Sequence, residues 1–353
     1  MKHIIYIFLV ITFLGCSILS SSDQATSENK FDDRGYFRIM FYNTENLFDT
    51  YDDTLKNDEQ FLPKGDKHWT YTKYLEKLKN IYKVIIGVGG WEPPEVVGLC
   101  ELENRLVLEE LLSKTPLQNI DYEIIHFESP DRRGIDVGML YRKSKFQVIE
   151  KKPIPVVFPF DANKPTRDIL YVKGITSKND TLHLFVNHWP SRWGGQMETD
   201  GKRQYAASVV RKNVDSILNT NPKANIVIMG DFNDHANNKS LTDVLRANRK
   251  YDNISNNELY NLTYHLEESE GLGTHKYQGE WGVLDHLIVS GNILNHTTNP
   301  FSSLSGVHIY NKEFLLEKDN GAVGYKPFRT YVGFKFHGGF SDHLPVYLDL
   351  YRH

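Results

Sequence analysis

Near the middle of the chain the sequence reads Ile226-Val-Ile-Met-Gly-Asp-Phe-Asn-Asp234, and this segment is expected to form the centre of the fold. Its four apolar, mostly β-branched residues predict a buried strand. Gly230 is expected to end the strand, because glycine lets the backbone turn sharply without a Cβ in the way. Alternate residues of an extended chain share a side, so Asp231 and Asn233 are expected to point the same way. An anionic proton acceptor beside a neutral amide suits a site for a metal-bound anion and an attacking water, although Asp and Asn are also common turn formers.

Composition limits the kinds of protein that this chain can be. The chain has 353 residues, of which 24% are charged and 40% hydrophobic, so one large domain or two ordinary ones are expected. The net charge of -4 argues against a broad basic surface and against charge-driven binding of nucleic acid, while it permits a local basic channel.

The first residues have the pattern of an export signal. Lys2 gives a positive start, an apolar run covers 4–14, and Gly15-Cys16 follows. The run is too short to span a bilayer. A small residue before Cys16 resembles a bacterial lipoprotein signal, in which Cys16 is lipidated. Phe13 and Leu14 depart from its commonest form, and the alternative is an ordinary secretory signal. We therefore expect a signal at 1–16 and an exported, periplasmic or cell-surface lipoprotein, attached to the membrane through its lipid alone.

Two further features concern the rest of the chain. Residues 17–35 are polar and are expected to form a flexible tether. Cys100 is the one other cysteine, so no internal disulfide framework is expected. It lies in an apolar strand segment, which favours a buried, inert thiol over a nucleophile.

Hydrophobic spacing predicts more strands than helices. Strands are predicted at 37–42, 96–100, 122–127, 137–141, 148–157, 169–175, 182–187, 284–290 and 344–350, and helices at 71–88, 106–112 and 202–218. This order predicts an α+β fold, a four-layer α/β/β/α sandwich of two mixed sheets packed face to face with helices outside. Residues 291–339 lack a regular pattern and are expected to form substrate-side loops. Since no linker divides 36–353, we expect one catalytic domain and a monomer.

Polar side chains gather where the predicted strands begin or end, which is where sites collect in open and sandwiched sheets. Singly, each has a structural interpretation as a turn former, a surface acid, a helix start or a satisfied structural histidine. Their number at strand ends is harder to attribute to turns. The residues are Asn43 and Glu45, Glu101 and Asn104, His188, Asp231 and Asn233, Asp285, and Asp342 with His343.

Attack of water on a phosphate ester is the chemistry that these residue types fit. The negative charge of the ester repels a nucleophile, so a cation is needed. Carboxylate oxygens favour a hard ion such as Mg²⁺, and the sequence has no Cys/His cluster at zinc spacing. Histidines at two strand ends can donate to the charge that grows on phosphoryl oxygens, and a neighbouring aspartate fixes the tautomer.

The segments that carry these residues resemble those of the endonuclease/exonuclease/phosphatase superfamily. Its members are metal-dependent phosphoesterases such as DNase I, exonuclease III, inositol polyphosphate 5-phosphatases and neutral sphingomyelinases. The resemblance extends over about residues 36–350. The matching segments are Phe41-Tyr-Asn-Thr-Glu-Asn46, Gly98-Leu-Cys-Glu-Leu-Glu-Asn104, Arg133-Gly-Ile-Asp136, Asn187-His-Trp-Pro-Ser191, Gly230-Asp-Phe-Asn-Asp234, Leu284-Asp-His286 and Ser341-Asp-His-Leu-Pro345.

The resemblance implies a role for each matching residue. Asp231 would activate or position the water with Asn233 beside it, and His343, oriented by Asp285, would stabilise the phosphoryl oxygens or act as general base. His188 would bind a phosphate oxygen. The implied ligands of the Mg²⁺ ion, with Mn²⁺ or Ca²⁺ as alternatives, are Glu101, Asn43, Glu45 and Asp342.

Substrate contacts are predicted less directly. Asp136 and Arg133 would help to shape the site. Arg192, Arg203 and Arg167 are candidate phosphate contacts, with solvated surface arginines as the alternative. Trp193 and Trp281 could stack on a base, although core packing is the simpler interpretation for Trp281.

Three functions remain open at this point. The first is an exported, Mg²⁺-dependent phosphodiesterase, a nuclease that hydrolyses DNA or RNA. The second keeps the same site for a phosphatase or for a phospholipid or sphingomyelin-type phosphodiesterase acting at an envelope surface. The third is a catalytically inactive binding protein. The sequence leaves endonuclease or exonuclease action and the number of metal ions undecided.

Overall fold

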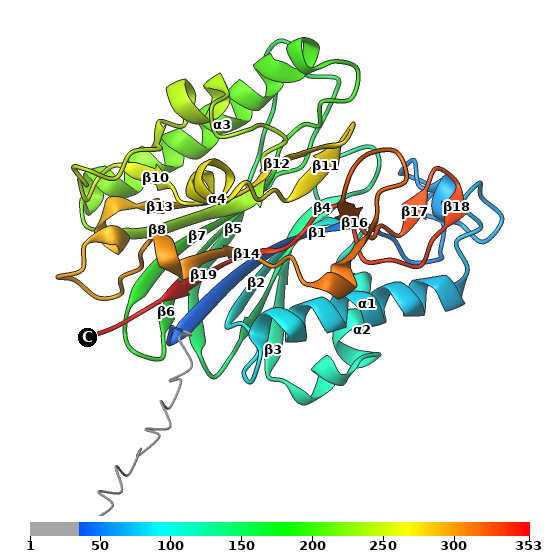
Figure 1. Ribbon diagram of the computed structural model, residues 1–353, viewed down its shortest axis with the longest axis horizontal. Helices are drawn as coiled ribbons and strands as arrows, with labels where there is room; N and C mark the ends of the chain where they lie inside the picture. The colour runs from blue at the N-terminus through cyan, green and yellow to red at the C-terminus, as the bar shows by residue number, and fades with distance from the viewer. Residues whose placement is uncertain (1–34) are drawn as a thin grey trace, which may run out of the picture. The chain divides into compact units, whose positions relative to one another are not determined.

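The computed structural model describes residues 35–353. The predicted signal at 1–16, including Cys16, and the tether at 17–35 lie outside the described residues, apart from Gly35. Two large mixed sheets pack face to face, with α1 and α2 over one sheet and α3 over the other (Figure 1). This arrangement confirms the predicted four-layer α/β/β/α sandwich. Within residues 35–353, no helix has both the length and the apolar character of a membrane-spanning segment.

The six-stranded sheet has β1 and β2 at its centre. These two strands run parallel, and β19 pairs antiparallel with β1 on the other side. Because β1 is covered on both faces, almost every residue in it is buried. The strands, in sheet order, are β14 (Val307–Ile309), β19 (Val346–Leu350), β1 (Phe37–Leu47), β2 (Val96–Leu102), β4 (Asp136–Arg142) and β3 (Tyr122–His126).

The seven-stranded sheet is built around the parallel pair β7 and β8. The segment at 226–234 supplies β8, the central strand of this sheet, and β13 pairs antiparallel with it. The strands, in sheet order, are β5 (Phe146–Ile154), β6 (Ile169–Thr176), β7 (Thr181–His188), β8 (Asn225–Asp231), β13 (Asp285–Ser290), β10 (Leu259–Asn261) and β9 (Ala247–Asn248).

Helices and small hairpins complete the described part of the chain. The α-helices are α1 (Tyr71–Gly89), α2 (Arg105–Ser113), α3 (Gln196–Thr220) and α4 (Thr263–Glu270). Short 3₁₀ or π turns are η1 (Glu59–Phe61), η2 (Pro116–Asn119), η3 (Ser240–Val244), η4 (Gly291–Leu294), η5 (Leu304–Gly306) and η6 (Glu313–Leu315). The hairpins are β11–β12 (His275–Tyr277 and Glu280–Gly282), β15–β16 (Leu316–Lys318 and Tyr325–Pro327) and β17–β18 (Tyr331–Val332 and Lys335–Phe336).

Apolar side chains from the facing surfaces of the two sheets form the central core. Met229 of β8 packs against the bare backbone of Gly98 in β2, where an added Cβ would lie 2.9 Å from the Met229 sulfur. Cys100 is fully buried in this core, as expected. Another apolar cluster lies between α3 and the seven-stranded sheet, with Val210, Val214 and Ile228 among its members. The two clusters explain why the chain forms four layers.

Several predicted boundaries are wrong. Gly230 does not end β8, which runs on to Asp231. It is glycine because an added Cβ would lie 2.4 Å from the backbone oxygen of Asn187 in the adjoining strand. Strand β5 starts and ends before the predicted 148–157, and β19 starts after Pro345, which has no N–H to donate to a ladder.

The predicted helix at 202–218 starts too late. Helix α3 begins at Gln196, directly after Gly195, whose φ of 120° suits glycine. Its first turn is fixed from within, since Thr199 donates to the Gly195 oxygen and Arg203 donates to the Gln196 oxygen. The earlier start places Arg203 inside the helix and not in its first turn.

Candidate active site

The polar strand ends of both sheets meet at one cleft of about 880 Å³. The six-stranded sheet contributes Glu101 from β2 and, from the segment before β19, Asp342 and His343. The seven-stranded sheet contributes His188 from β7 and Asp231 from β8. Residues that are far apart in the sequence therefore face the same space.

Strand pairing explains why the ends of the seven-stranded sheet coincide. His188 lies opposite Asp231 in the parallel β7–β8 ladder, and Asp285 lies opposite Asp231 in the antiparallel β8–β13 ladder. The last residues of β7 and β8 and the first residue of β13 are therefore at one level of the sheet. One buried edge brings together an imidazole and two carboxylates.

Backbone irregularities turn the catalytic candidates toward the cleft. The register of β2 shifts between Cys100 and Leu102, and Glu101 between them has a φ of 58°. Glu45 and Asn233 also have positive φ, at 52° each. Left-handed backbone is costly for residues with a Cβ, and it concentrates at functional sites. Because of this shift, the Glu101 side chain does not follow the regular alternation of side chains between the two faces of the sheet.

Asp285 orients the imidazole of His343. The Nδ1 of His343 lies 2.7 Å from Asp285 Oδ2, and its Nε2 lies 3.8 Å from Asp231 Oδ2. Burial alone would lower the pKa of His343, but the charges of Asp285 and Asp231 outweigh it and raise the pKa well above its usual value. The raised pKa favours the protonated ring, whose Nε2–H can donate a hydrogen bond toward the cleft.

Asp231 is a buried carboxylate with two fixed hydrogen bonds. It accepts from the Asn43 Nδ2 at 3.0 Å and from the backbone N–H of Asn233 at 2.9 Å. Burial, with a smaller contribution from the charge of Asp285, raises the pKa of Asp231 to about 7, against the opposing effect of His343. A carboxylate with this pKa can accept a proton from water near neutral pH.

The ring of His188 lies between two acids. Its Nε2 lies 3.8 Å from Glu101 Oε1 and 3.8 Å from Asp231 Oδ2. Burial lowers the pKa of His188 well below its usual value, and the neighbouring Arg167 and Arg133 lower it further. In the described part of the chain, its buried Nδ1 has no hydrogen-bond partner. The neutral ring can offer one N–H to an anion in the cleft.

The four residues predicted to hold a metal ion differ in what they present to the cleft. Glu101 and Asp342 line it, with side chains 16% and 22% exposed. Both oxygens of Glu45 are occupied by Arg329 and by the Thr330 backbone N–H. The Asn43 oxygen accepts from the Glu45 backbone N–H.

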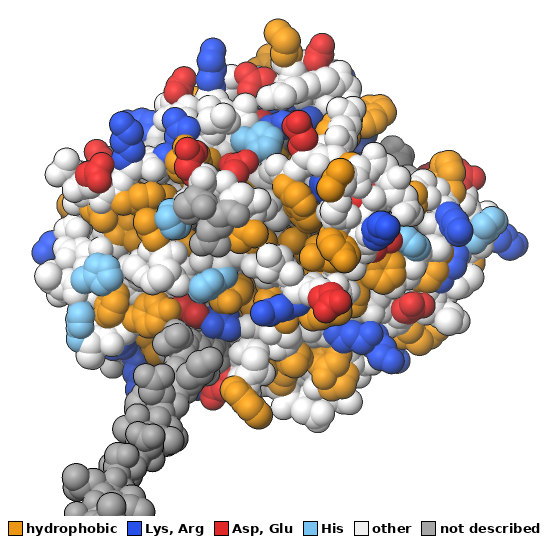
Figure 2. Space-filling model, in the orientation of Figure 1, with side chains coloured by type: hydrophobic (Ala, Val, Ile, Leu, Met, Phe, Trp, Pro, Cys, Tyr) orange, Lys and Arg blue, Asp and Glu red, His pale blue; other side chains and the backbone are white. Residues whose placement is uncertain are grey.

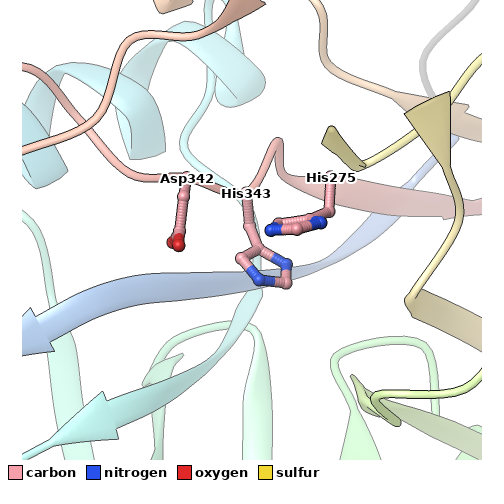
Figure 3. A group of neighbouring side chains, drawn as sticks. All are labelled: His275, Asp342 and His343. Carbon is pink, nitrogen blue, oxygen red and sulfur yellow. The ribbon is translucent and has the colours of Figure 1, made fainter. Parts of the chain in front are cut away.

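Glu101 Oε2 accepts from the Asn46 backbone N–H at 2.9 Å and Asp342 Oδ2 accepts from Arg329, but both side chains reach the cleft, unlike Glu45, and could hold a divalent cation there. This set fits a hard ion such as Mg²⁺, which keeps several waters and needs few carboxylates. His275, Asp342 and His343 also offer ligand atoms within 4.8 Å of one another, and Figure 3 shows the three side chains next to one another, with His343 in the middle. His343 Nδ1 bonds Asp285, and Asp342 Oδ2 accepts from Arg329, so this second group is partly committed within the protein.

The predicted substrate contacts are mostly interior residues. Arg203 is fully buried, with its Nε 2.8 Å from Asp234. Arg167 is buried between Asp131 and the Trp189 oxygen. The prediction that these two arginines contact phosphate is wrong, because each neutralises or caps an interior group.

Asp136 and Arg192 are also tied within the protein. Asp136 is buried and bonds His126 at 3.0 Å and the Ser129 backbone N–H at 2.8 Å, so it supports a loop and does not line the cleft. Arg192 lines the cleft, but its Nε donates to the Asn233 oxygen at 2.7 Å. It positions the loop after β8.

Several residues in or behind the cleft were not predicted from the sequence. Arg329 lies between two hairpins in the segment 291–339, where the sequence has no readable period. His275 comes from β11, a strand that was not predicted. Lys77 is buried behind the cleft, with its ammonium 2.6 Å from the Phe340 oxygen, and burial lowers its pKa to about 8. A lysine on the apolar face of α1, next to Leu78, was the available signal for this residue.

Aromatic side chains border the cleft. Trp281 of β12 is half-buried there, whereas Trp193 and Tyr277 are 90% and 68% exposed. The simpler interpretation of Trp281 as a core residue is therefore incomplete, because the ring also lines the cleft. Exposed rings beside a polar centre suit contact with the flat part of a substrate.

Comparison with known proteins agrees with this geometry. A family model described as the endonuclease/exonuclease/phosphatase family matches residues 38–352. No relative is found among curated protein sequences.

Solved structures share the fold at low identity. An endonuclease/exonuclease/phosphatase family protein from Bacteroides thetaiotaomicron has 13% identity and a TM-score of 0.55, covering 90% of this chain and 98% of that chain. Truncated Caenorhabditis elegans TDP2 has 16% identity and a TM-score of 0.53, covering 91% and 100%. A Bacteroides thetaiotaomicron mannosyl-6-phosphatase has 14% identity and a TM-score of 0.53, covering 90% and 100%.

Proposed function

This chain belongs to the endonuclease/exonuclease/phosphatase family, and we propose that it uses a divalent cation, in the first place Mg²⁺, to hydrolyse an anionic phosphate ester. The observation that carries the proposal is the linked group of Asp285, His343 and Asp231, which faces the same cleft as Glu101 and Asp342. The group joins a proton acceptor, a proton donor and candidate metal ligands within one cleft.

Each residue of the site has its own role in hydrolysis. Asp231 accepts the proton of the attacking water, and the Asn43 and Asn233 contacts hold its carboxylate in place. His343 donates to a phosphoryl oxygen as negative charge grows there, because Asp285 keeps the imidazole charged and correctly turned. His188 donates to a second oxygen of the same group.

Glu101 and Asp342 are the proposed metal ligands. When bound, a divalent cation supplies positive charge that offsets the charge of the phosphoryl group. Mn²⁺ and Ca²⁺ are the alternative ions. Asn43 and Glu45, which the resemblance also implies as ligands, are hydrogen-bonded to Asp231 and Arg329.

A nucleic-acid phosphodiester is the first substrate class that we propose. Trp193 and Trp281 beside the cleft support it, because aromatic rings stack on bases. A solved relative of the fold, Danio rerio TDP2, is described in complex with a single-strand DNA product.

A small phosphate monoester or a lipid phosphodiester is the second candidate. The burial of Arg203 and Arg167 favours it, because fewer cations remain to follow a polynucleotide backbone. On the face in Figure 2, the Lys and Arg side chains are interspersed with Asp and Glu. One similar structure is that of a mannosyl-6-phosphatase.

A substrate panel with and without chelator tests the proposal. Purified protein is incubated with plasmid DNA, RNA, a phospholipid, a sugar phosphate and chromogenic phosphomonoester and phosphodiester substrates. We expect Mg²⁺-dependent turnover of at least one nucleic acid. Preference for the monoesters or the lipid selects the second candidate, and no turnover with Mg²⁺ or Mn²⁺ rejects the phosphoesterase.

We also propose that the protein is an exported monomer anchored by a lipid on Cys16. The support is the signal pattern of residues 1–16. Metabolic labelling with palmitate is expected to mark the wild-type chain and not Cys16→Ser. Light scattering of detergent-solubilised protein checks the oligomeric state.

A further inference from the structure

Arg329 is held by two acids at the edge of the cleft. Its Nε lies 3.1 Å from Glu45 Oε1, and its Nη2 lies 2.7 Å from Asp342 Oδ2. The second oxygen of Glu45 accepts a hydrogen bond from the backbone N–H of Thr330 at 2.6 Å. Glu45 therefore binds both the Arg329 side chain and the backbone of the next residue. A guanidinium fixed at two corners cannot rotate freely.

The rest of the Arg329 guanidinium faces open space. Its side chain is 41% exposed and lines the same cleft as Glu101 and His343. Among the residues that the structure describes, Nη1 has no hydrogen-bond partner. One pair of N–H groups is therefore available to a ligand in the cleft.

Two other cations near the cleft are committed to protein atoms, whereas Arg133 lines the cleft with its side chain 49% exposed and its Nε 3.7 Å from Asp131 Oδ1. Lys77 is buried, and its ammonium donates to Thr330 and to the Phe340 oxygen. Arg192 donates to Asn233 and contacts Asp234. Lys77 and Arg192 are occupied by protein atoms. Arg133 and Arg329 are both open to the cleft, but Arg329 is fixed by hydrogen bonds to two carboxylates, whereas Arg133 has one looser carboxylate contact.

We propose that Arg329 binds a phosphoryl oxygen of the substrate and that Glu45 is the residue that positions it, not a ligand of the metal ion. The inference rests on the proposed phosphoesterase function. Glu101, Asp231 and Asp342 give the cleft an acidic character that repels an anion. A guanidinium offsets this charge and presents a planar fork that suits phosphate oxygens.

Titration calorimetry with inorganic phosphate, on full-length protein with saturating Mg²⁺, tests the proposal directly. Arg329→Met is expected to weaken phosphate binding and to raise KM by about 10- to 100-fold, since a charge-assisted hydrogen bond is lost. Arg329→Lys keeps the charge and is expected to recover part of the binding. Arg246→Met is the matched control, because Arg246 is 58% exposed and pairs with Asp215 at 2.9 Å outside the cleft. It is expected to bind phosphate as the wild type does.

Glu45→Gln separates the two roles of that residue. If Glu45 positions Arg329, the variant weakens phosphate binding but binds Mn²⁺, measured by calorimetry without substrate, as the wild type does. Weaker Mn²⁺ binding instead makes Glu45 a metal ligand and overturns its assignment.

Two further outcomes bear on the proposal. Wild-type phosphate affinity in folded Arg329→Met and Arg329→Lys overturns it, even if both variants unfold at lower temperature. If the wild type hydrolyses none of the panel substrates, the proposed function fails, whereas the phosphate titrations still decide whether Arg329 binds the anion.

Discussion

Asp285 and His343 are 58 residues apart in the chain, yet their side chains meet at 2.7 Å. Asp285 begins β13 of the seven-stranded sheet, and His343 precedes β19 of the six-stranded sheet. Their hydrogen bond therefore joins the two sheets at the point where the chemistry is proposed to occur. Both side chains are buried, so the bond is shielded from water.

Asp285→Asn is expected to lower kcat by about 10- to 100-fold with little change in KM, because the amide no longer keeps His343 charged and turned toward the cleft. Steady-state kinetics on the preferred panel substrate measures the effect. Asp215→Asn is the control, since Asp215 pairs with Arg246 away from the cleft. Wild-type kcat in Asp285→Asn contradicts the assigned role.

Activity is expected to fall as the pH drops below about 7. Burial raises the pKa of Asp231 to about 7, and only its unprotonated form can accept a proton from water. The loss should approach about tenfold for each pH unit below that pKa. The acidic limb should move to lower pH as Mg²⁺ is raised, because positive charge at Glu101 stabilises the neighbouring carboxylate. A flat profile of kcat/KM through neutral pH excludes Asp231 as the base.

A chelator is expected to abolish activity, and added Mg²⁺ is expected to restore it. Glu101→Gln removes a charged oxygen from the proposed ligand pair. Its Mn²⁺ affinity, measured by calorimetry, should fall by about 10- to 100-fold or more. Loss of a residue that only hydrogen-bonds a metal ligand already has an effect of this size. Glu109→Gln, at a side chain that is 51% exposed on α2, should bind Mn²⁺ as the wild type does. Full activity in the presence of the chelator contradicts the proposed requirement for a divalent cation.

Gly230→Ala is expected to destabilise the fold by about 1–3 kcal/mol or more, because the new Cβ would lie 2.4 Å from the Asn187 oxygen. Urea unfolding measures the change. Gly201→Ala is the matched control, because nothing lies within 4 Å of a Cβ added there. This substitution within α3 should stabilise by about 0.5–1 kcal/mol. Equal stability of the two variants contradicts the close approach of β7 and β8.

Local patterns explain why much of the fold could be predicted. Strands such as β2 and β8 contain continuous apolar runs followed by polar residues, and each can be recognised within about ten positions. The polar ends then identified the residues that meet in the cleft. Gly230 shows a limit of sequence-based prediction. A glycine can allow a chain turn or the close approach of a neighbouring backbone, and the sequence alone does not distinguish these two roles.

Other parts of the site depend on partners that are distant in the chain. Arg329 and Glu45 are 284 residues apart, and Arg329 lies in a segment without periodicity. The helix predicted at 202–218 begins at Gln196, where the Gly195 N-cap makes no side-chain hydrogen bond that the sequence could reveal. Arg203 was a candidate phosphate contact by residue type alone, and the sequence does not show that it pairs with Asp234 in the interior.

The packing of Met229 on Gly98 has a consequence for how the protein becomes active. Each sheet carries only part of the catalytic set, and this contact is one of those that set their spacing. During refolding, strands can form before the sheets dock, but hydrolysis has to wait for docking. The rate at which activity returns would therefore report the docking of the two sheets. Substitutions at Gly98 would slow this return without altering any residue that touches the substrate.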